Sequence, residues 1–498
     1  MFRVLLICIG RNYTSMVHCF RINGDNIALD VNSNALHIVT DAAVDLIRAL
    51  SMIDVQALFE RAHDGPTCTV SQKRAAQDCF IGALSAAERR YGIEAANSAA
   101  SDIVALIEDG QLFAPGADEP GDASGLAGTY VFKSLCLHLA HDCNMRCAYC
   151  FASEGSFGLG RELMGAETAR AAIDFVTGAS GGRKNIEIDF FGGEPLLNFD
   201  VLKRTVDYAR SRERESGKRF RFTLTTNGLL LDDGAIRYVN DNMDNLVMSI
   251  DGRQAVNDRM RECLDGTGTY DIIVKNFHKA IRGRTGSWYV RGTYTALNKD
   301  FTNDVLHLAD IGFDRISVEP VVSPIDPALE FSAGDADELE AEYEKLALAL
   351  SERQIQGKPI DFFHFNVDLD SGPCLARRIK GCGAGYEYAA VAPNGDIYPC
   401  HQFVGAEGFR LGTVFDGIGG QTAAQKLELF KRTNIYSKED CRACWARFFC
   451  GGGCAANAWH YNRDIEKPSA FYCRLFRKRI ECALWLRCAP YIEKTRLA

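Results

Sequence analysis

The sequence contains no apolar run close to the roughly 20 residues that a membrane-spanning helix requires. The longest run near its beginning, residues 4–9, is also too short for the core of a signal peptide, although Arg3 precedes it. Positive charge is not in excess either, because 56 Lys and Arg residues are outnumbered by 65 Asp and Glu residues, giving a net charge of −9. A general nucleic-acid binder needs a basic face to neutralise phosphates. We therefore expect a cytoplasmic protein that binds neither a membrane nor a nucleic acid.

Cysteine, by contrast, is abundant, with 19 residues in a chain of 498. In a long cytosolic chain thiols stay reduced, so clustered cysteines more often bind metal than form disulfides. Eleven of them lie in two regions, residues 143–150 and 374–473. The others are scattered, and for these the simpler interpretation is a small buried hydrophobic side chain: Cys8, Cys19, Cys68, Cys79, Cys136, Cys263, Cys482 and Cys488.

A chain of this length predicts two or three domains. The patterned sequence begins at Met16, which is an alternative to Met1 as the start of translation. Residues 16–110 alternate short strand-like and helical pieces, with a hairpin whose turn is Asn23-Gly24-Asp25, and with Asp41 as the candidate cap of a helix. The expected strands are 17–22, 26–31 and 37–39, and the expected helices are 41–52, 75–86 and 98–108. Residues 111–128, rich in Gly, Pro, Ala and Asp, predict a linker.

Residues 129–368 alternate strand and helix patterns, which predicts βαβ units and a parallel sheet. The expected strands are 135–139, 186–191, 221–226, 245–250, 289–296 and 316–320, with helices such as 166–175 and 201–212 between them. Six units predict an α/β fold, a partial (β/α)6 TIM-like barrel whose chemistry gathers at the carboxyl ends of the strands. The tail, residues 369–498, is rich in Gly and Cys; we expect it to bury little core and to be held together by metal.

Three cysteines follow the first barrel strand on one loop, in the order Cys143-x3-Cys147-x2-Cys150. Thiolates so closely spaced can hold three irons of a [4Fe–4S] cluster, which takes four ligands. No fourth cysteine follows locally, so one iron would be open to a chelating ligand, as in a catalytic metal site. The alternative is a zinc site or an accidental grouping of thiols, which the position at the carboxyl end of a strand disfavours.

This spacing, with an aromatic residue before the last cysteine, resembles the signature of the radical S-adenosylmethionine (SAM) superfamily. Residues 192–195 likewise resemble the family's GGEP motif. The resemblance implies that SAM chelates the open iron and that the reduced cluster cleaves SAM to a 5′-deoxyadenosyl radical, which takes a hydrogen atom from the substrate. It also implies the SAM-binding residues: Tyr149 near the adenine, Gly192, Gly193, Glu194 and Pro195 at the amino group, Asn227, Ser249 and Asp251 in polar turns, Arg261, and Leu297 packing on the adenine.

The string of cysteines in the tail resembles the SPASM domain, which carries two auxiliary [4Fe–4S] clusters. By that resemblance one cluster takes Cys441, Cys444, Cys450 and Cys473, and the other takes Cys382, Cys400 and Cys454. Cys374 either completes the second cluster or leaves it with an open site where a substrate thiolate binds; we favour its being a ligand. Three clusters in total are therefore expected.

Four shorter motifs resemble one group of radical SAM/SPASM enzymes and so indicate a more specific activity. Residues 141–144, 150–155, 381–385 and 398–403 are similar to the SCIFF (ranthipeptide) maturases, radical SAM/SPASM enzymes that form thioether bonds in ribosomally synthesised, cysteine-rich precursor peptides. This implies an oxidoreductase of RiPP maturation, a leader peptide bound by the winged-helix-like, RRE-like domain of residues 16–110, and a reducing partner such as flavodoxin or ferredoxin.

Three questions stay open at this stage. An anaerobic sulfatase-maturase-like enzyme that forms formylglycine, or another SPASM protein-modifying enzyme, is the alternative activity, and a non-enzymatic zinc-binding adaptor is the alternative from another class. The residues 16–110 are alternatively a purely structural cap. Glu319, at the end of a barrel strand, is either part of the barrel interior or a substrate contact.

Overall fold

The computed structural model describes residues 16–53, 55, 70–115, 130–322, 326–367, 369 and 375–497. Met1, Cys8, Cys68, Cys374 and most of the expected linker lie outside the described residues. Within the described ranges, no helix is both long and apolar enough to cross a membrane.

The N-terminal unit is a three-stranded antiparallel sheet of order β1-β2-β3. The expected hairpin is confirmed, and its turn consists of Asn23 and Gly24, both at positive φ (52° and 83°), which suits the twist of a two-residue hairpin. Thr40 caps the first helix by accepting a hydrogen bond from the amide of Ala43, so the expectation that Asp41 is the cap was wrong. The elements are β1 (Val17–Ile22), β2 (Asp25–Asp30), β3 (Leu36–Val39), α1 (Asp41–Leu50), α3 (Val70–Tyr91) and α4 (Ile93–Glu108).

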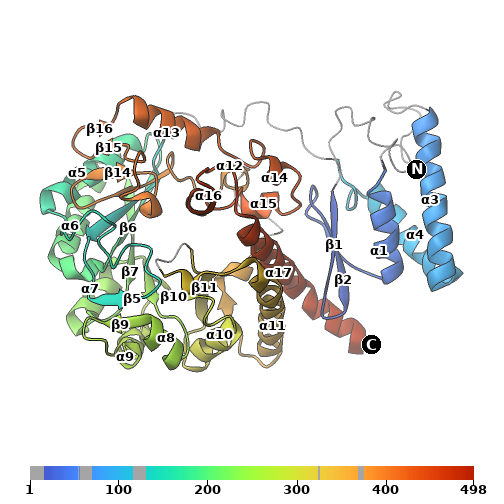
Figure 1. Cartoon of the computed structure of the whole chain (residues 1–498), viewed down its shortest axis with the longest axis horizontal. Helices are drawn as coiled ribbons and strands as arrows, with labels where there is room; N and C mark the ends of the chain where they lie inside the picture. The colour runs from blue at the N-terminus through green and yellow to red at the C-terminus, as the bar shows by residue number, and fades with distance from the viewer. Residues whose placement is uncertain are drawn as a thin grey trace.

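This sheet is covered on both faces, because successive residues of a strand point to opposite sides. Ala28 packs into a core cluster with side chains of α1 and α4. Its neighbours Ile27 and Leu29 pack into the main core, which includes side chains of the last helix, α17 (Ala470–Leu497). The sheet therefore lies between α1 and α4 on one side and α17 on the other (Figure 1).

The six expected barrel strands are confirmed, and all are parallel neighbours in one sheet. With the helices between them they form an α/β domain, a partial TIM-like barrel. The strands are β4 (Ser134–Ala140), β6 (Asn185–Gly192), β7 (Arg219–Thr226), β8 (Asn245–Ser249), β10 (Ser287–Tyr294) and β11 (Arg315–Pro320), with β12 (Asp361–Phe362) at the edge. The helices are α5 (Ala166–Ala179), α6 (Phe199–Ser216), α7 (Asp233–Asn242), α8 (Gln254–Met260), α9 (Tyr270–Ile281), α10 (Phe301–Asp310) and α11 (Ala336–Ile355).

The tail extends the barrel sheet. Strand β13 (Tyr388–Val391) pairs in parallel with β4, and β14 (Asp396–Tyr398), β15 (Gly412–Thr413) and β16 (Gly417–Ile418) follow antiparallel. Ala389, Phe403 and Phe409 are fully buried, so the expectation of a tail with little core was wrong. A strand that pairs with an existing sheet can bury apolar side chains even where the sequence shows no helical pattern of hydrophobic residues. The tail helices before α17 are α12 (Leu375–Lys380), α13 (Gln421–Arg432), α14 (Glu439–Arg442), α15 (Arg447–Cys450) and α16 (Ala455–Asn462).

Helix α17 contacts both the barrel and the N-terminal sheet. Near its start Arg474 pairs with Glu340 of α11 at 2.5 Å, and one turn later Lys478 pairs with Glu344 at 2.8 Å. Farther along the helix, a carboxylate oxygen of Glu481 lies 2.9 Å from the imidazole Nε2 of His18 in β1. The helix thus lies against the barrel at one end and the N-terminal sheet at the other (Figure 1).

Candidate active site

The loop with three cysteines is held by a short ladder that the sequence did not reveal. Strand β5 (Met145–Cys147) pairs antiparallel with β9 (Arg261–Cys263), which follows helix α8, and places Cys147 opposite Arg261. The amide of Ala148 also donates to the carbonyl of Met260 at 2.9 Å. The thiol-bearing residues Cys143, Cys147 and Cys150 line one cavity of about 220 Å³ at the carboxyl ends of the barrel strands.

Two glycines let the end of β6 approach this loop. A Cβ on Gly192 would lie 2.3 Å from the carbonyl oxygen of Ala140, and one on Gly193 would lie 2.1 Å from that of Asp142. Gly192 also has a φ of 125°, which side chains disfavour. The amide of Gly193 donates to the Ala140 carbonyl at 2.8 Å. These glycines therefore bring two strand ends together beside the cavity that they line.

Glu194 lies behind the cavity wall and is fully buried. Its carboxylate accepts hydrogen bonds from the amide of Asn227 at 2.8 Å, from the hydroxyl of Thr226 at 2.8 Å and from the amide of Leu196 at 3.0 Å. Burial raises the pKa of this carboxyl to about 7, and these hydrogen bonds offset part of the rise. Glu194 thus ties the end of β6 to the end of β7.

A second buried group joins the cysteine loop to β8 and β10. The hydroxyl of Tyr149 donates to the carboxylate of Asp251 at 2.8 Å and accepts from Arg261 at 2.7 Å. Asp251 is fully buried and also accepts from the amide of Thr293 at 3.0 Å. Burial raises the pKa of Asp251, while the guanidinium of Arg261 lowers it. Tyr149 is therefore fixed in position by a cation and a carboxylate that lie on different strand ends.

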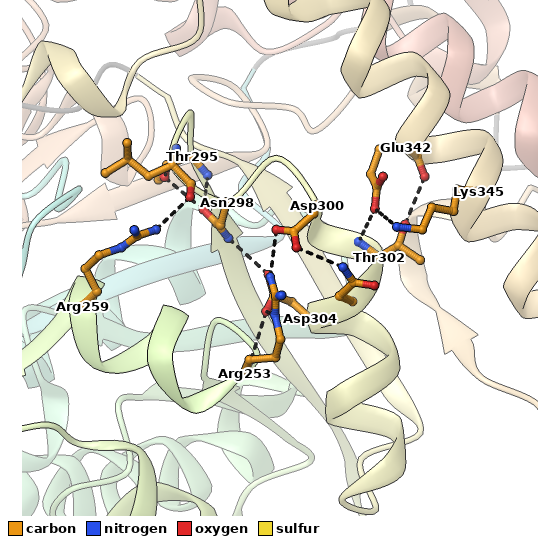
Figure 2. A network of polar contacts seen from close by, with 11 residues as sticks. Arg253, Arg259, Thr295, Asn298, Asp300, Thr302, Asp304, Glu342 and Lys345 are labelled. Atoms are coloured by element: carbon orange, nitrogen blue, oxygen red, sulfur yellow. Dashed lines mark hydrogen bonds and ion pairs between the residues drawn. The ribbon is translucent and has the colours of Figure 1, made fainter.

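A polar network outside the cavity holds the turns after β8 and β10 (Figure 2). The buried carboxylate of Asp304 accepts from the amide and the guanidinium of Arg253, at 3.0 and 2.7 Å. It also accepts from Asn298, whose own side-chain oxygen accepts from the amide of Thr295 at 2.8 Å. Arg259 donates to the carbonyl of Leu297 at 2.8 Å. The network fixes the backbone of the turn that carries Leu297, whose side chain is 49% exposed.

The three loop thiols are suited to bind iron together. Burial raises the pKa of Cys143 to about 11 and that of Cys147 to about 12, and the charge of the Cys150 thiol adds to both shifts. Metal uptake by such thiols releases protons, because iron binds the thiolate. Among the described residues, no three His, Cys, Asp or Glu side chains are grouped to hold a single metal ion. Cysteine thiolates are the ligands that iron–sulfur clusters take in proteins.

The tail thiols form two groups. Burial raises the pKa of Cys400 well above its usual value, and the charges of Cys454 and Cys382 add to the shift. Burial likewise raises the pKa of Cys450 to about 12, and here the added charges are those of Cys473, Cys441 and Cys444. Electrostatic coupling of this kind requires proximity. Cys382 and Cys454 therefore lie near Cys400, and Cys441, Cys444, Cys450 and Cys473 line one cavity together. The two ligand sets themselves stay a prediction.

A second cavity, of about 280 Å³, adjoins the first and includes Cys454 and Cys473 in its lining. The two cavities share Glu319, Pro320, Val322 and Gln402. Glu319 forms an ion pair with Arg291 of β10 at 2.6 Å, and its side chain keeps 37% exposure. Burial opposes ionisation of Glu319, but Arg291 and His364 outweigh it and lower the pKa to about 2. Glu319 is therefore a cavity residue that carries a charge.

Some of the predicted SAM contacts line the first cavity and the others do not. Tyr149, Gly192, Gly193, Asn227, Ser249 and Arg261 line the first cavity with the three cysteines. Glu194, Pro195 and Asp251 are buried beside it, and Leu297 lies outside its lining. Sequence reasoning missed Arg291 and Thr293 as cavity residues, because their spacing carries no motif, and it did not assign Gln402 of the 398–403 motif to the cavity. Of the eight scattered cysteines, Cys136, Cys482 and Cys488 are buried, and Cys19, Cys79 and Cys263 are half-buried.

Comparison with known proteins agrees with this geometry. Residues 137–320 match the model of the Radical SAM superfamily, and residues 382–445 match that of SPASM, an iron–sulfur cluster-binding domain. These matches span the cysteine loop with the barrel strands that surround it and the first part of the tail. Both kinds of domain bind [4Fe–4S] clusters.

Similar proteins include two maturases. A Cys-type anaerobic sulfatase-maturating enzyme of Clostridium perfringens is 22% identical over 360 residues, covering 68% of this chain and 93% of that protein. The mycofactocin maturase MftC of Mycolicibacterium smegmatis is 26% identical over 344 residues, covering 67% and 81%. The solved structure of native anSMEcpe with bound AdoMet superposes with a TM-score of 0.59 at 19% identity, covering 72% of this chain and 99% of that chain.

Proposed function

We propose that this chain, a radical SAM/SPASM enzyme, forms thioether bonds in a ribosomally synthesised, cysteine-rich precursor peptide. The observation that carries the proposal is the pair of adjoining cavities, one lined by the three loop cysteines and the other by cysteines of the tail. A peptide segment that occupies both cavities has one residue beside the site of radical formation and another beside the tail thiols. That arrangement suits a reaction that joins a sulfur to a distant carbon.

In this proposal the cysteines hold three [4Fe–4S] clusters. Cys143, Cys147 and Cys150 hold the SAM-binding cluster, Cys441, Cys444, Cys450 and Cys473 hold one auxiliary cluster, and Cys382, Cys400 and Cys454 hold the other. The electrostatic coupling within each set supports the assignment. Cys374 lies outside the described residues, and its role as a fourth ligand stays a prediction.

When bound, the loop cluster and SAM would supply a 5′-deoxyadenosyl radical able to remove one hydrogen atom from a substrate carbon, and an auxiliary iron–sulfur cluster would accept the surplus electron. The donor cysteine would lose its thiol proton to water, and its sulfur would bond to that carbon. A flavodoxin or ferredoxin supplies the electron for SAM cleavage. Residues of this chain position SAM and the peptide. Tyr149 and Arg261 are held at the wall of the first cavity by their hydrogen bond. The ion pair of Glu319 and Arg291 lies where the two cavities meet.

The N-terminal unit recognises the leader of the precursor. An extended peptide can add a strand to an exposed sheet edge, with affinity from backbone hydrogen bonds. Strands β1 and β3 are both edges of this sheet, and a cavity of about 1350 Å³ runs along β3. The proposed leader site is therefore the free edge of β3.

A second candidate function is the oxidation of a cysteine or serine to formylglycine in a sulfatase. Its support is the likeness to a Cys-type anaerobic sulfatase-maturating enzyme and to anSMEcpe. That reaction needs a base, and Glu319 is the carboxylate that lines both cavities. Against the effect of burial, its ion pair with Arg291, at 2.6 Å, lowers the pKa of Glu319 below the ordinary value and so makes it a weaker base.

Mass spectrometry of a co-expressed precursor peptide tests the proposal. The candidate is a short peptide with several cysteines, encoded beside this chain. Each thioether should remove two hydrogens and one alkylatable thiol, with all sulfur retained. Loss of sulfur from the peptide would indicate formylglycine instead, and an unmodified peptide in the presence of SAM and reductant would refute the thioether proposal.

A further inference from the structure

Lys438 is a cation buried in the tail, with 3% of its surface exposed. It lies in the turn before α14, where its carbonyl oxygen accepts hydrogen bonds from the amides of Cys441 and Arg442 at 3.1 and 3.0 Å. Its ammonium group donates to the carbonyl oxygen of Gly452 at 2.8 Å. Lys438 therefore joins the chain just before Cys441 to the glycine turn that follows Cys450.

The charge of Lys438 is not balanced by a carboxylate. A buried ammonium group is stable only when other groups compensate its charge. Lys478 of α17 shows the usual arrangement, because Glu344 and Glu481 pair with it at 2.8 and 2.9 Å. Among the residues that the structure describes, Lys438 forms no ion pair, and its ammonium group donates to one backbone carbonyl. A carbonyl oxygen has only a partial charge, so the compensating negative charge must come from another group.

The wall beside this ammonium group belongs to a cavity of about 290 Å³. Gly452 lines that cavity together with the four cysteines of one proposed cluster, Cys441, Cys444, Cys450 and Cys473. Burial raises the pKa of Cys441 to about 11, and the charge of Lys438 opposes the rise. Four thiolates that hold a [4Fe–4S] cluster give their site a net negative charge. The loaded cysteine site therefore supplies the charge that Lys438 lacks.

The other charged groups at this cavity also leave an excess of positive charge. The lining includes Arg447, Arg477 and one carboxylate, Asp440. Burial raises the pKa of Cys473, and Arg477 and Lys438 both oppose that rise. The two arginines line the cavity, whereas Lys438 lies behind the wall that Gly452 forms. The charge of Lys438 thus acts on what the cysteines bind, without contact to a substrate in the cavity.

We infer that Lys438 is the buried counter-ion of the cluster that these four cysteines hold, and that it raises the reduction potential of that cluster. The reduced cluster has one more negative charge than the oxidised cluster, so a fixed positive charge beside it stabilises the reduced form more. Burial strengthens this effect, because water and salt screen a buried charge less. The inference rests on the proposed cluster and names a residue that tunes it.

Two variants separate the charge of Lys438 from its hydrogen bond. Lys438→Gln removes the charge and keeps a donor for the carbonyl of Gly452, whereas Lys438→Arg keeps both. Potentiometric titration of the full-length, anaerobically reconstituted protein, followed by electron paramagnetic resonance, measures the midpoint potential of each cluster. The signal of this cluster is the one that is absent from Cys441→Ala/Cys444→Ala.

Lys438→Gln should make the midpoint potential of this cluster more negative, while the signals of the other clusters stay in place. The expected change in the equilibrium constant for one-electron reduction is about tenfold, which corresponds to about 59 mV. Lys438→Arg should stay close to the wild-type value. Lys478→Gln is the matched control, because Lys478 is only 15% exposed but already has two carboxylate partners. It should leave the midpoint potential unchanged.

An unchanged midpoint potential in Lys438→Gln would overturn the inference, and so would a wild-type cluster that titanium(III) citrate does not reduce. If Lys438→Gln does not retain the irons of this cluster, their retention in Lys438→Arg supports the counter-ion, and their loss from both variants overturns it. An iron content that Cys441→Ala/Cys444→Ala leaves unchanged would refute the proposed cluster itself. Thioether formation is scored separately on the precursor peptide, so a shifted potential without cross-linking refutes only the proposed reaction.

Discussion

The cysteines of the barrel and those of the tail are brought together in different ways. Cys143, Cys147 and Cys150 belong to one loop, and a single ladder between β5 and β9 holds them. The grouped thiols of the tail come from loops, short helices and the first turn of α17, spread over residues 382–473. The first arrangement is local, whereas the second exists only when distant segments are folded against one another.

The difference has consequences for stability. A ligand set that spans eight residues closes small loops, and these cost little chain entropy. A set that joins distant segments constrains a long stretch of chain, so metal binding there contributes more to folding. We expect the barrel cysteines to matter mainly for chemistry, and the tail cysteines for both chemistry and the integrity of the tail.

The largest effect is expected from Cys143→Ala/Cys147→Ala/Cys150→Ala. The variant should produce no 5′-deoxyadenosine and should bind about four fewer irons of roughly twelve after anaerobic reconstitution. The tail should keep its iron, because none of its grouped thiols comes from this loop. Cys482→Ala, at a buried position in α17, is the control and should retain both activity and iron. An unchanged iron content in the triple variant would contradict the local cluster.

The second-largest effect is expected from replacing two grouped cysteines of the tail. Cys441→Ala/Cys444→Ala should also lose about four irons, yet continue to cleave SAM, while thioether formation stops. Its melting temperature should fall more than that of the barrel triple variant, because Cys473 of the same group anchors the start of α17. Equal loss of SAM cleavage in both variants would show that the two regions are not separable. Iron analysis, product chromatography and anaerobic calorimetry provide the three measurements.

The smallest effect is the pH dependence of the barrel's buried carboxyl, Glu194. Its pKa is raised to about 7 in the folded chain from an ordinary value near 4.5, so the folded state binds the extra proton between these values. Stability therefore falls as pH rises through this window, by up to about 3 kcal/mol. Glu194→Gln cannot titrate at this position, so its stability should lack this fall and the difference between the two proteins should change with pH. Denaturant unfolding of both proteins between pH 5 and pH 8 measures the effect, and parallel curves would contradict it.

The local elements could be predicted from sequence because each depends on neighbouring residues. The six barrel strands alternate with helices at regular spacing, and Asn23 with Gly24 marks a two-residue turn. The cap of α1 was misplaced by one residue, since Thr40 and Asp41 are both good caps and only the backbone geometry distinguishes them. The core of the tail was missed because β13 is buried by pairing with β4, a strand some 250 residues earlier.

The sequence by itself determined the chemistry of this protein: the three-cysteine loop, the glycine turn after β6 and the cysteine-rich tail, because ligand type and close spacing are local properties. Only the tertiary structure decided which tail cysteines lie together, that Glu319 lines two cavities, and that α17 lines the cavity along β3. Those features depend on which surfaces of distant elements meet. Packing of that kind is set by the whole chain rather than by any one segment of it.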